Sequence, residues 1–168
     1  MIDPRTAVSL EWYELAMAIG VGERRQQQAG KLGCEDAHGF KGDGLEVHIE
    51  GACGEMAGSK WCGYYWPGTV GTFGYGGDAG IPSSDPGPQF RTRSRDYYDL
   101  IVRPNDRDED WFILVVGRRP SYHIVGWLYG KEAKQERWVK KYGGRPPAYF
   151  IPQANLRSPF ELQRRREE

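Results

Sequence analysis

Three oxygen-bearing side chains and one arginine occupy positions from which they could share a metal-dependent reaction. Glu55 lies in a glycine-rich stretch, Asp78 ends a second one, and Gln89 and Arg91 open the first strongly strand-like run. Residues two apart on a strand share a face. Carboxylate and amide oxygens suit Mg²⁺ or Mn²⁺, and an ion so held positions a water and stabilises the leaving oxygen of a phosphodiester. Glu55, Asp78 and Gln89 are therefore candidate metal ligands, and Arg91 is a candidate phosphate or transition-state stabiliser.

Further arginines continue this pattern. Arg93 and Arg95 follow at intervals of two, and Arg103 ends the next strand-like run. Such a stripe either contacts the phosphates of a nucleic acid or pairs with Asp96 and Asp99. We take Arg91, Arg93 and Arg95 as candidate phosphate contacts.

Each candidate also has a purely structural alternative. Glu55 could face solvent on its helix, and Asp78 follows two glycines, where aspartate is a natural turn former. Gln89 and Arg91 could be only the polar face of an edge strand. Five tryptophans are expected in the core rather than on a base-stacking surface: Trp61, Trp66, Trp111, Trp127 and Trp138.

Glycine spacing predicts the helix that would carry Glu55. Gly51, Gly54 and Gly58 fall at i, i+3 and i+7, which forms one bare stripe on a helix. Each interior glycine costs about 1 kcal/mol of helix propensity relative to alanine. The stripe therefore predicts a helix over residues 51–63 whose backbone packs closely against a neighbour.

The N-terminal segment also reads as helical. Val8, Trp12 and neighbouring apolar residues recur at helical spacing until Gly20 and Gly22, where we expect an interruption. A second short helix is expected over residues 23–28.

Strand signals dominate the second half of the chain. Short turns separate four runs, which predicts an antiparallel meander. These runs are residues 89–94, 98–103, 111–117 and 122–129. We further expect a helix over residues 131–141, a strand over 148–151, and a last helix whose capping box begins at Ser158.

Composition restricts the class of protein. A chain of 168 residues fits a single domain, and equal totals of 23 basic and 23 acidic residues exclude a global positive field. Any polyanion site must then be a local patch. The sequence has no long apolar run, which predicts a cytoplasmic protein without membrane contact. Its three cysteines are odd in number and lack C-x-x-C spacing, which predicts neither a disulfide framework nor a zinc site.

The order of the candidate residues resembles the PD-(D/E)XK nuclease superfamily. Its pattern is a helix glutamate, a strand aspartate and a (Glu or Gln)-x-Lys strand, to which Glu55, Asp78 and Gln89 correspond, with Arg91 in place of the lysine. The stretches GACGE, GDAG, QFRTRS, YDLIVRP, FILVVG, IVGW and PPAYFIPQ are similar to uncharacterised phage and prophage proteins. The resemblance covers roughly residues 45 to 155.

The resemblance implies an α/β, restriction-endonuclease-like fold, with a mixed or antiparallel sheet flanked by helices. We expect one domain over 1–168, made of a helical segment 1–31, a nuclease-like core 45–155 and a C-terminal helix 158–168. The implied function is Mg²⁺-dependent (or Mn²⁺-dependent) cleavage of DNA in the cytoplasm of a bacterial host. Arginine cannot release a proton near neutral pH, so Arg91 could stabilise but not act as a base.

That substitution supports a second hypothesis. The chain could be a nuclease-like fold that has lost its chemistry and acts as an accessory factor that binds DNA or protein. Its partner would then be DNA, a second copy of the chain, or a phage or host protein. A third alternative is a structural protein in which the motif is accidental.

Overall fold

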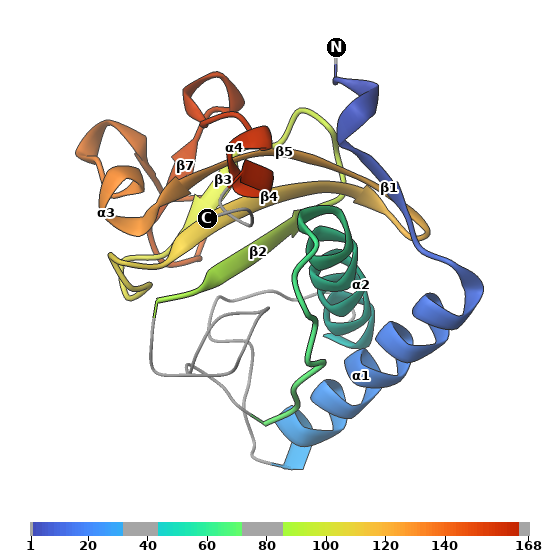
Figure 1. Ribbon diagram of the computed structural model, residues 1–168. Coiled ribbons are helices and arrows are strands. Elements are labelled where there is room, and N and C mark those ends of the chain that lie inside the picture. The colour runs from blue at the N-terminus through green and yellow to red at the C-terminus, as the bar shows by residue number, and fades with distance from the viewer. Residues whose placement is uncertain (1, 32–43, 72–85, 165–168) are drawn as a thin grey trace.

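The computed structural model describes residues 2–31, 44–71 and 86–164 (Figure 1). In these ranges, three short 3₁₀ helices accompany the regular elements: Pro4–Thr6, Glu136–Trp138 and Gln153–Asn155. The strands are β1 (Ala7–Ser9), β2 (Pro88–Arg93), β3 (Leu100–Val102), β4 (Trp111–Arg118), β5 (Ser121–Tyr129), β6 (Val139–Lys140) and β7 (Ala148–Ile151). The helices are α1 (Trp12–Lys31), α2 (Gly44–Cys62), α3 (Gly130–Ala133) and α4 (Phe160–Arg164).

The strands form two sheets, and helices α1 and α2 cover one side of the larger one. The larger sheet has the order β1-β5-β4-β2 and the smaller one the order β3-β7-β6. Figure 1 shows the smaller sheet on the side of the larger sheet opposite α2. The protein is therefore mixed α/β, as the sequence predicts.

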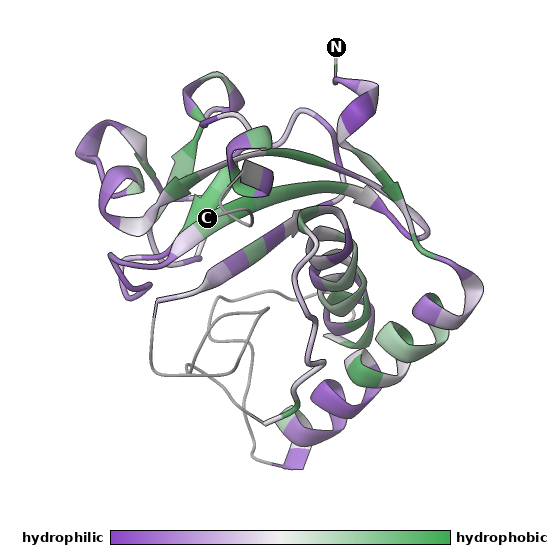
Figure 2. Ribbon diagram, in the orientation of Figure 1, coloured by the Kyte–Doolittle hydropathy of each residue, from purple (hydrophilic) through white to green (hydrophobic). Residues whose placement is uncertain are grey.

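Side chains along β4 point alternately to the two faces of the sheet, and they belong to two separate core clusters. Ile113 and Val115 pack in the cluster that includes residues of α2, whereas Phe112 and Leu114 pack with residues of β3 and β7. Both faces of β4 are thus covered, which explains why its sequence is continuously apolar. Figure 2 shows this strand in green, the colour of hydrophobic residues.

The glycine stripe brings α2 onto β2. A Cβ atom added at Gly54 would overlap the Thr92 side chain, and one at Gly58 would overlap the Phe90 ring. Gly51 differs, because an added Cβ there would meet nothing within 4 Å among the described residues. The predicted close packing of this helix is confirmed at two of its three glycines.

The expected interruption of the N-terminal helix is wrong. Helix α1 runs unbroken through Gly20 and Gly22, and Val8 lies instead in β1, which pairs antiparallel with β5. An added Cβ at Gly22 would lie 2.6 Å from the Ile49 Cα atom, so this glycine permits close contact between α1 and α2. Tertiary packing therefore outweighs the low helix propensity of glycine.

The predicted meander is only partly confirmed. Strands β4 and β5 are antiparallel, but β2 and β4 are parallel, and β3 joins the second sheet. A parallel pair needs a crossover connection. Residues 94–110 form that connection, and β3 lies within it.

The long helix expected over residues 131–141 is also wrong. The chain instead forms the single turn of α3, a 3₁₀ turn that buries Trp138, and then β6. The expected strand is present as β7, and the last helix, α4, begins two residues after Ser158.

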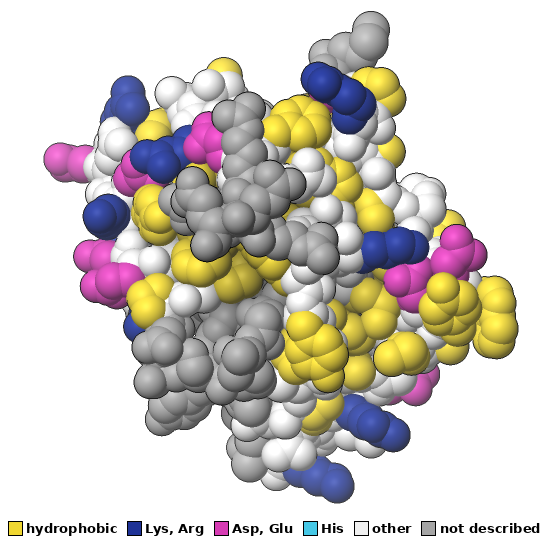
Figure 3. Space-filling model, in the orientation of Figure 1, with side chains coloured by type: hydrophobic (Ala, Val, Ile, Leu, Met, Phe, Trp, Pro, Cys, Tyr) yellow, Lys and Arg dark blue, Asp and Glu magenta, His cyan; other side chains and the backbone are white. Residues whose placement is uncertain are grey.

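Among the described residues, no helix is both long and apolar enough to cross a membrane. Helix α1 does leave large apolar side chains exposed, because Trp12, Tyr13 and Met17 are 78%, 52% and 60% exposed. Figure 3 shows hydrophobic side chains gathered over this part of the surface.

Candidate functional site

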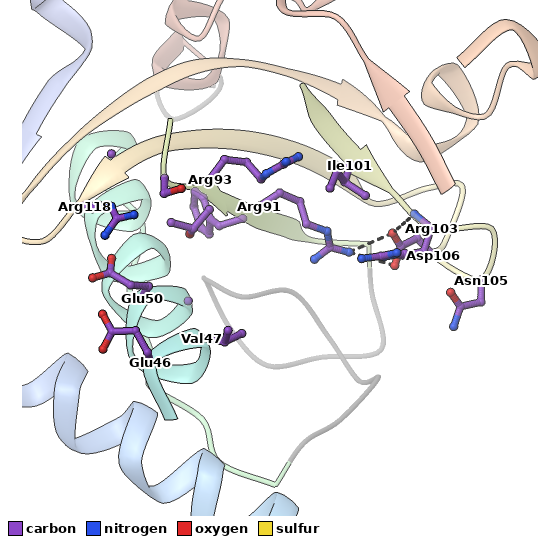
Figure 4. Close-up of a pocket in the computed structure, with 15 residues that line it drawn as sticks. Glu46, Val47, Glu50, Arg91, Arg93, Ile101, Arg103, Asn105, Asp106 and Arg118 are labelled. Carbon is purple, nitrogen blue, oxygen red and sulfur yellow. Dashed lines mark hydrogen bonds and ion pairs between the residues drawn. The ribbon is translucent and has the colours of Figure 1, made fainter. Parts of the chain in front are cut away.

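A cavity of about 620 Å³ follows the edge of β2 that β4 does not pair with (Figure 4). Five consecutive residues at 90–94 line it. Helix α2 forms one wall with Glu46 and Glu50, and the segment around Arg103 and Asp106 forms the other. Consecutive strand residues alternate in direction, so both faces of β2 border this cavity.

Arg119, which is not among the residues lining the cavity, offsets one of the two negative charges of the acidic wall on α2. Arg119 donates to Glu46 at 3.0 Å and to Glu50 at 2.5 Å, and the Tyr122 hydroxyl donates to Glu50 at 2.8 Å. Burial, together with the bond to Glu50, raises the pKa of Tyr122 above its ordinary value. Tyr122 therefore stays a neutral donor, and these two carboxylates already have partners.

Arg91 is fixed against the opposite wall. Its guanidinium donates to both oxygens of Asp106 at 3.0 Å and lies 5.0 Å from the centre of the Phe112 ring. The contact with Phe112 places Arg91 on the face of the sheet away from α2. The Asp106 carboxylate also accepts from the Arg103 backbone amide at 2.7 Å, which holds the turn after β3 in place.

Arg93 lies deeper and on the same face. Its guanidinium donates to the Asp99 carbonyl at 2.9 Å and stacks 4.5 Å from the centre of the Tyr98 ring. Burial lowers the pKa of Arg93; Tyr98 and Asp99 oppose this shift, whereas the charges of Arg103 and Arg145 add to it. Arg93 therefore lies within the electrostatic field of two further guanidinium groups.

A second cavity of about 390 Å³ adjoins the first. Both are lined by Arg93, Ile101 and Arg103, so the two are parts of one groove. We call the combined surface the arginine groove. The arginines that line it are Arg91, Arg93, Arg103, Arg118 and Arg145.

Glu55 lies elsewhere, in the corner between α1 and α2. Its two oxygens accept from Arg25 at 2.8 and 2.9 Å, and one also accepts from the Trp66 ring nitrogen at 3.3 Å. The side chains of Arg25 and Glu55 are 16% and 13% exposed. The carboxylate is therefore a mostly buried structural partner of Arg25.

The structure does not bring Glu55 together with the other described candidates. Phe90 and Thr92 face α2, so Gln89 and Arg91, at alternate positions, face the opposite side of the sheet. The side-chain nitrogen of Gln89 lies 3.5 Å from a carboxylate oxygen of the buried Asp110. Asp78 lies outside the described residues.

The described residues do not fit the magnesium site expected from the sequence. Glu55 is engaged by a guanidinium, and the Gln89 amide belongs to the other face of the sheet. Within residues 2–31, 44–71 and 86–164, no cluster of three histidine, cysteine, aspartate or glutamate side chains could hold an ion.

Two of the three arginines proposed as phosphate contacts line the groove. Arg91 and Arg93 line it, whereas Arg95 is exposed in the turn after β2 and is absent from the lining of both cavities. Sequence reasoning did not identify Arg118, because it lies far along the chain at the end of β4. It also gave no role to Tyr97 and Tyr142, although Tyr97 stands close to several arginines in the sequence.

No protein-family model, curated protein or solved structure matches this chain.

Proposed function

We propose that this protein binds nucleic acid through the phosphate backbone, in the arginine groove. One observation carries the proposal: five arginines from separate parts of the chain line a single groove that follows the edge of β2. Guanidinium groups suit phosphates because their planar donors match two oxygens at once. Contacts to phosphates position a nucleic acid without reading its sequence.

The charge distribution is consistent with a local site. The chain has as many basic as acidic residues, so it exerts no general attraction on a polyanion. Arg119 offsets one of the two carboxylate charges of the α2 wall from outside the groove, and Asp106 is paired with Arg91. Arg93 and Arg103 line both cavities.

Binding is favoured over cleavage by the state of the candidate catalytic groups. The Glu55 carboxylate is held by Arg25, and the Arg91 guanidinium cannot accept a proton from water. This favours the second of the three hypotheses drawn from the sequence, an accessory factor that binds DNA or protein, in its DNA-binding form. Mg²⁺-dependent cleavage remains the alternative, and the experiment below includes it.

Arg118 offers a direct test because it lines the groove and is exposed. We would measure the affinity for labelled DNA by fluorescence anisotropy at several salt concentrations. Each phosphate contact contributes about 0.7 to 0.9 to the slope of log K against log salt. Arg118→Gln should reduce that slope by about this amount. The matched control is Arg24→Gln, which removes an equal charge from an exposed position on α1 and should leave the slope unchanged.

Equal slopes for the two variants, or no DNA binding by the native protein, would contradict the proposal. The same samples, incubated with Mg²⁺ or Mn²⁺ and analysed on a gel, report on cleavage. Cleavage that Gln89→Ala abolishes would favour the metal-dependent alternative instead.

A further inference from the structure

The second cavity differs from the first in its aromatic residues. Tyr97 and Tyr142 line it from two different loops, and they are 70% and 55% exposed. Its volume of about 390 Å³ falls within the range of small-ligand pockets, about 300 to 1,000 Å³. It therefore offers both space and exposed ring surface.

Each exposed tyrosine is held by an inner ring. Tyr97 meets Tyr98 edge to face with ring centres 5.1 Å apart, and Tyr142 meets Phe150 in the same way at 4.9 Å. Such T-shaped contacts restrict the orientation of the outer ring. The two tyrosines are thus oriented before any ligand arrives, which lowers the entropy that binding would cost.

Guanidinium groups border the same cavity. Arg93, Arg103 and Arg145 line it, and among the described residues of its lining Asp99 is the one that is acidic. Lys140 lies 3.7 Å from the Asp99 carboxylate and offsets its charge. Exposed rings beside arginines are the combination that proteins use to bind single strands, in which bases stack on aromatic side chains and arginines follow the backbone.

We infer that the cavity between Tyr97 and Tyr142 accepts a base of single-stranded nucleic acid, while Arg93, Arg103 and Arg145 contact the adjoining phosphates. The inference rests on the proposed function and adds the substrate class to it. A duplex keeps its bases stacked inside, so it could offer only phosphates to this surface. The wider cavity along β2 would hold the backbone of the neighbouring nucleotides.

The test compares two single strands of equal charge. One is fluorescein-labelled dT12, and the other has the same backbone with every base replaced by an abasic site. Base stacking contributes about 5-fold to 150-fold in affinity per base, so dT12 should bind more tightly than the abasic strand by at least about 5-fold. Tyr97→Leu and Tyr142→Leu should each remove most of this preference and leave the abasic strand's affinity unchanged. Tyr65→Leu, at a tyrosine that is 73% exposed and absent from the lining of the groove, is the matched control.

The outcomes separate this inference from the proposed function. Equal affinities for dT12 and the abasic strand, or a preference that both leucine variants retain, would overturn the base site. Salt-dependent binding of both strands would in that case still support the phosphate-binding groove. Failure of both strands to bind would overturn the two together.

Discussion

Helix α2 forms one wall of the groove, and its contact with β2 can be tested by adding single methyl groups. Gly54→Ala places a Cβ into the Thr92 side chain, whereas Gly51→Ala places one where nothing lies within 4 Å among the described residues. Both substitutions gain about 1 kcal/mol of helix propensity. The difference between the two variants therefore isolates the cost of packing.

That cost can be worked from the contact. The Thr92 hydroxyl is buried and makes no hydrogen bond to the residues described, so its displacement carries a steric penalty only. Overpacking typically costs about 1 to 3 kcal/mol. For a chain of this length 1 kcal/mol corresponds to about 2 to 4 °C in Tm. We expect Gly51→Ala to melt about 2 to 4 °C above the native protein, and Gly54→Ala to melt about 2 to 12 °C below Gly51→Ala.

Thermal melts followed by circular dichroism measure both values. Thr92→Ala removes two of the three atoms nearest to the added Cβ, so it should recover part of the loss caused by Gly54→Ala. Equal melting temperatures for the two alanine variants, or no rescue by Thr92→Ala, would refute the packing of α2 on β2 described above.

Two further predictions concern charges and thiols. Glu55→Gln should cost about 3 kcal/mol, because it removes the negative charge that faces the mostly buried Arg25 guanidinium. Asp108→Asn, at a carboxylate that is 56% exposed and pairs with Lys134, should cost under about 1 kcal/mol. Urea unfolding measures both, and equal costs would contradict the structural role of Glu55. Burial raises the pKa of Cys53 to about 11 and of Cys62 to about 12, against about 8.5 when unfolded. The unfolded thiols lose protons first, so stability should fall as pH rises above about 8.5, and Cys62→Ala should reduce the loss between pH 8 and 10 by about 2 kcal/mol. An unchanged loss in that variant would contradict the burial of Cys62.

Local patterns predicted the elements that depend on neighbouring residues. The glycine stripe at 51, 54 and 58 correctly indicated a closely packed helix, and the apolar run at 112–116 indicated a strand covered on both faces. The errors arose where contacts between residues far apart in the sequence determine the local structure. Gly22 remains helical because it lies against Ile49, and β2 pairs parallel with β4 because β3 is taken into the second sheet.

At the candidate site, too, local spacing predicted some features, whereas contacts between residues far apart in the sequence were not predicted. Period-two spacing correctly placed Gln89, Arg91 and Arg93 on one face. No local signal showed that Glu55 would pair with Arg25, which lies 30 residues earlier on another helix. Tyr97 and Tyr142 reach the same cavity from loops 45 residues apart in sequence. Sequence spacing alone does not predict such a meeting.

Hydrogen exchange with and without dT12 tests the central claim most directly, because it locates a bound strand on the protein. We predict slower exchange in peptides covering residues 89–106 and 140–147, which form β2, β3 and the two loops of the tyrosine cavity. Peptides from α1 should exchange at unchanged rates. Protection confined to the exposed apolar surface of α1 around Trp12, or no protection at saturating dT12, would contradict nucleic-acid binding in the arginine groove.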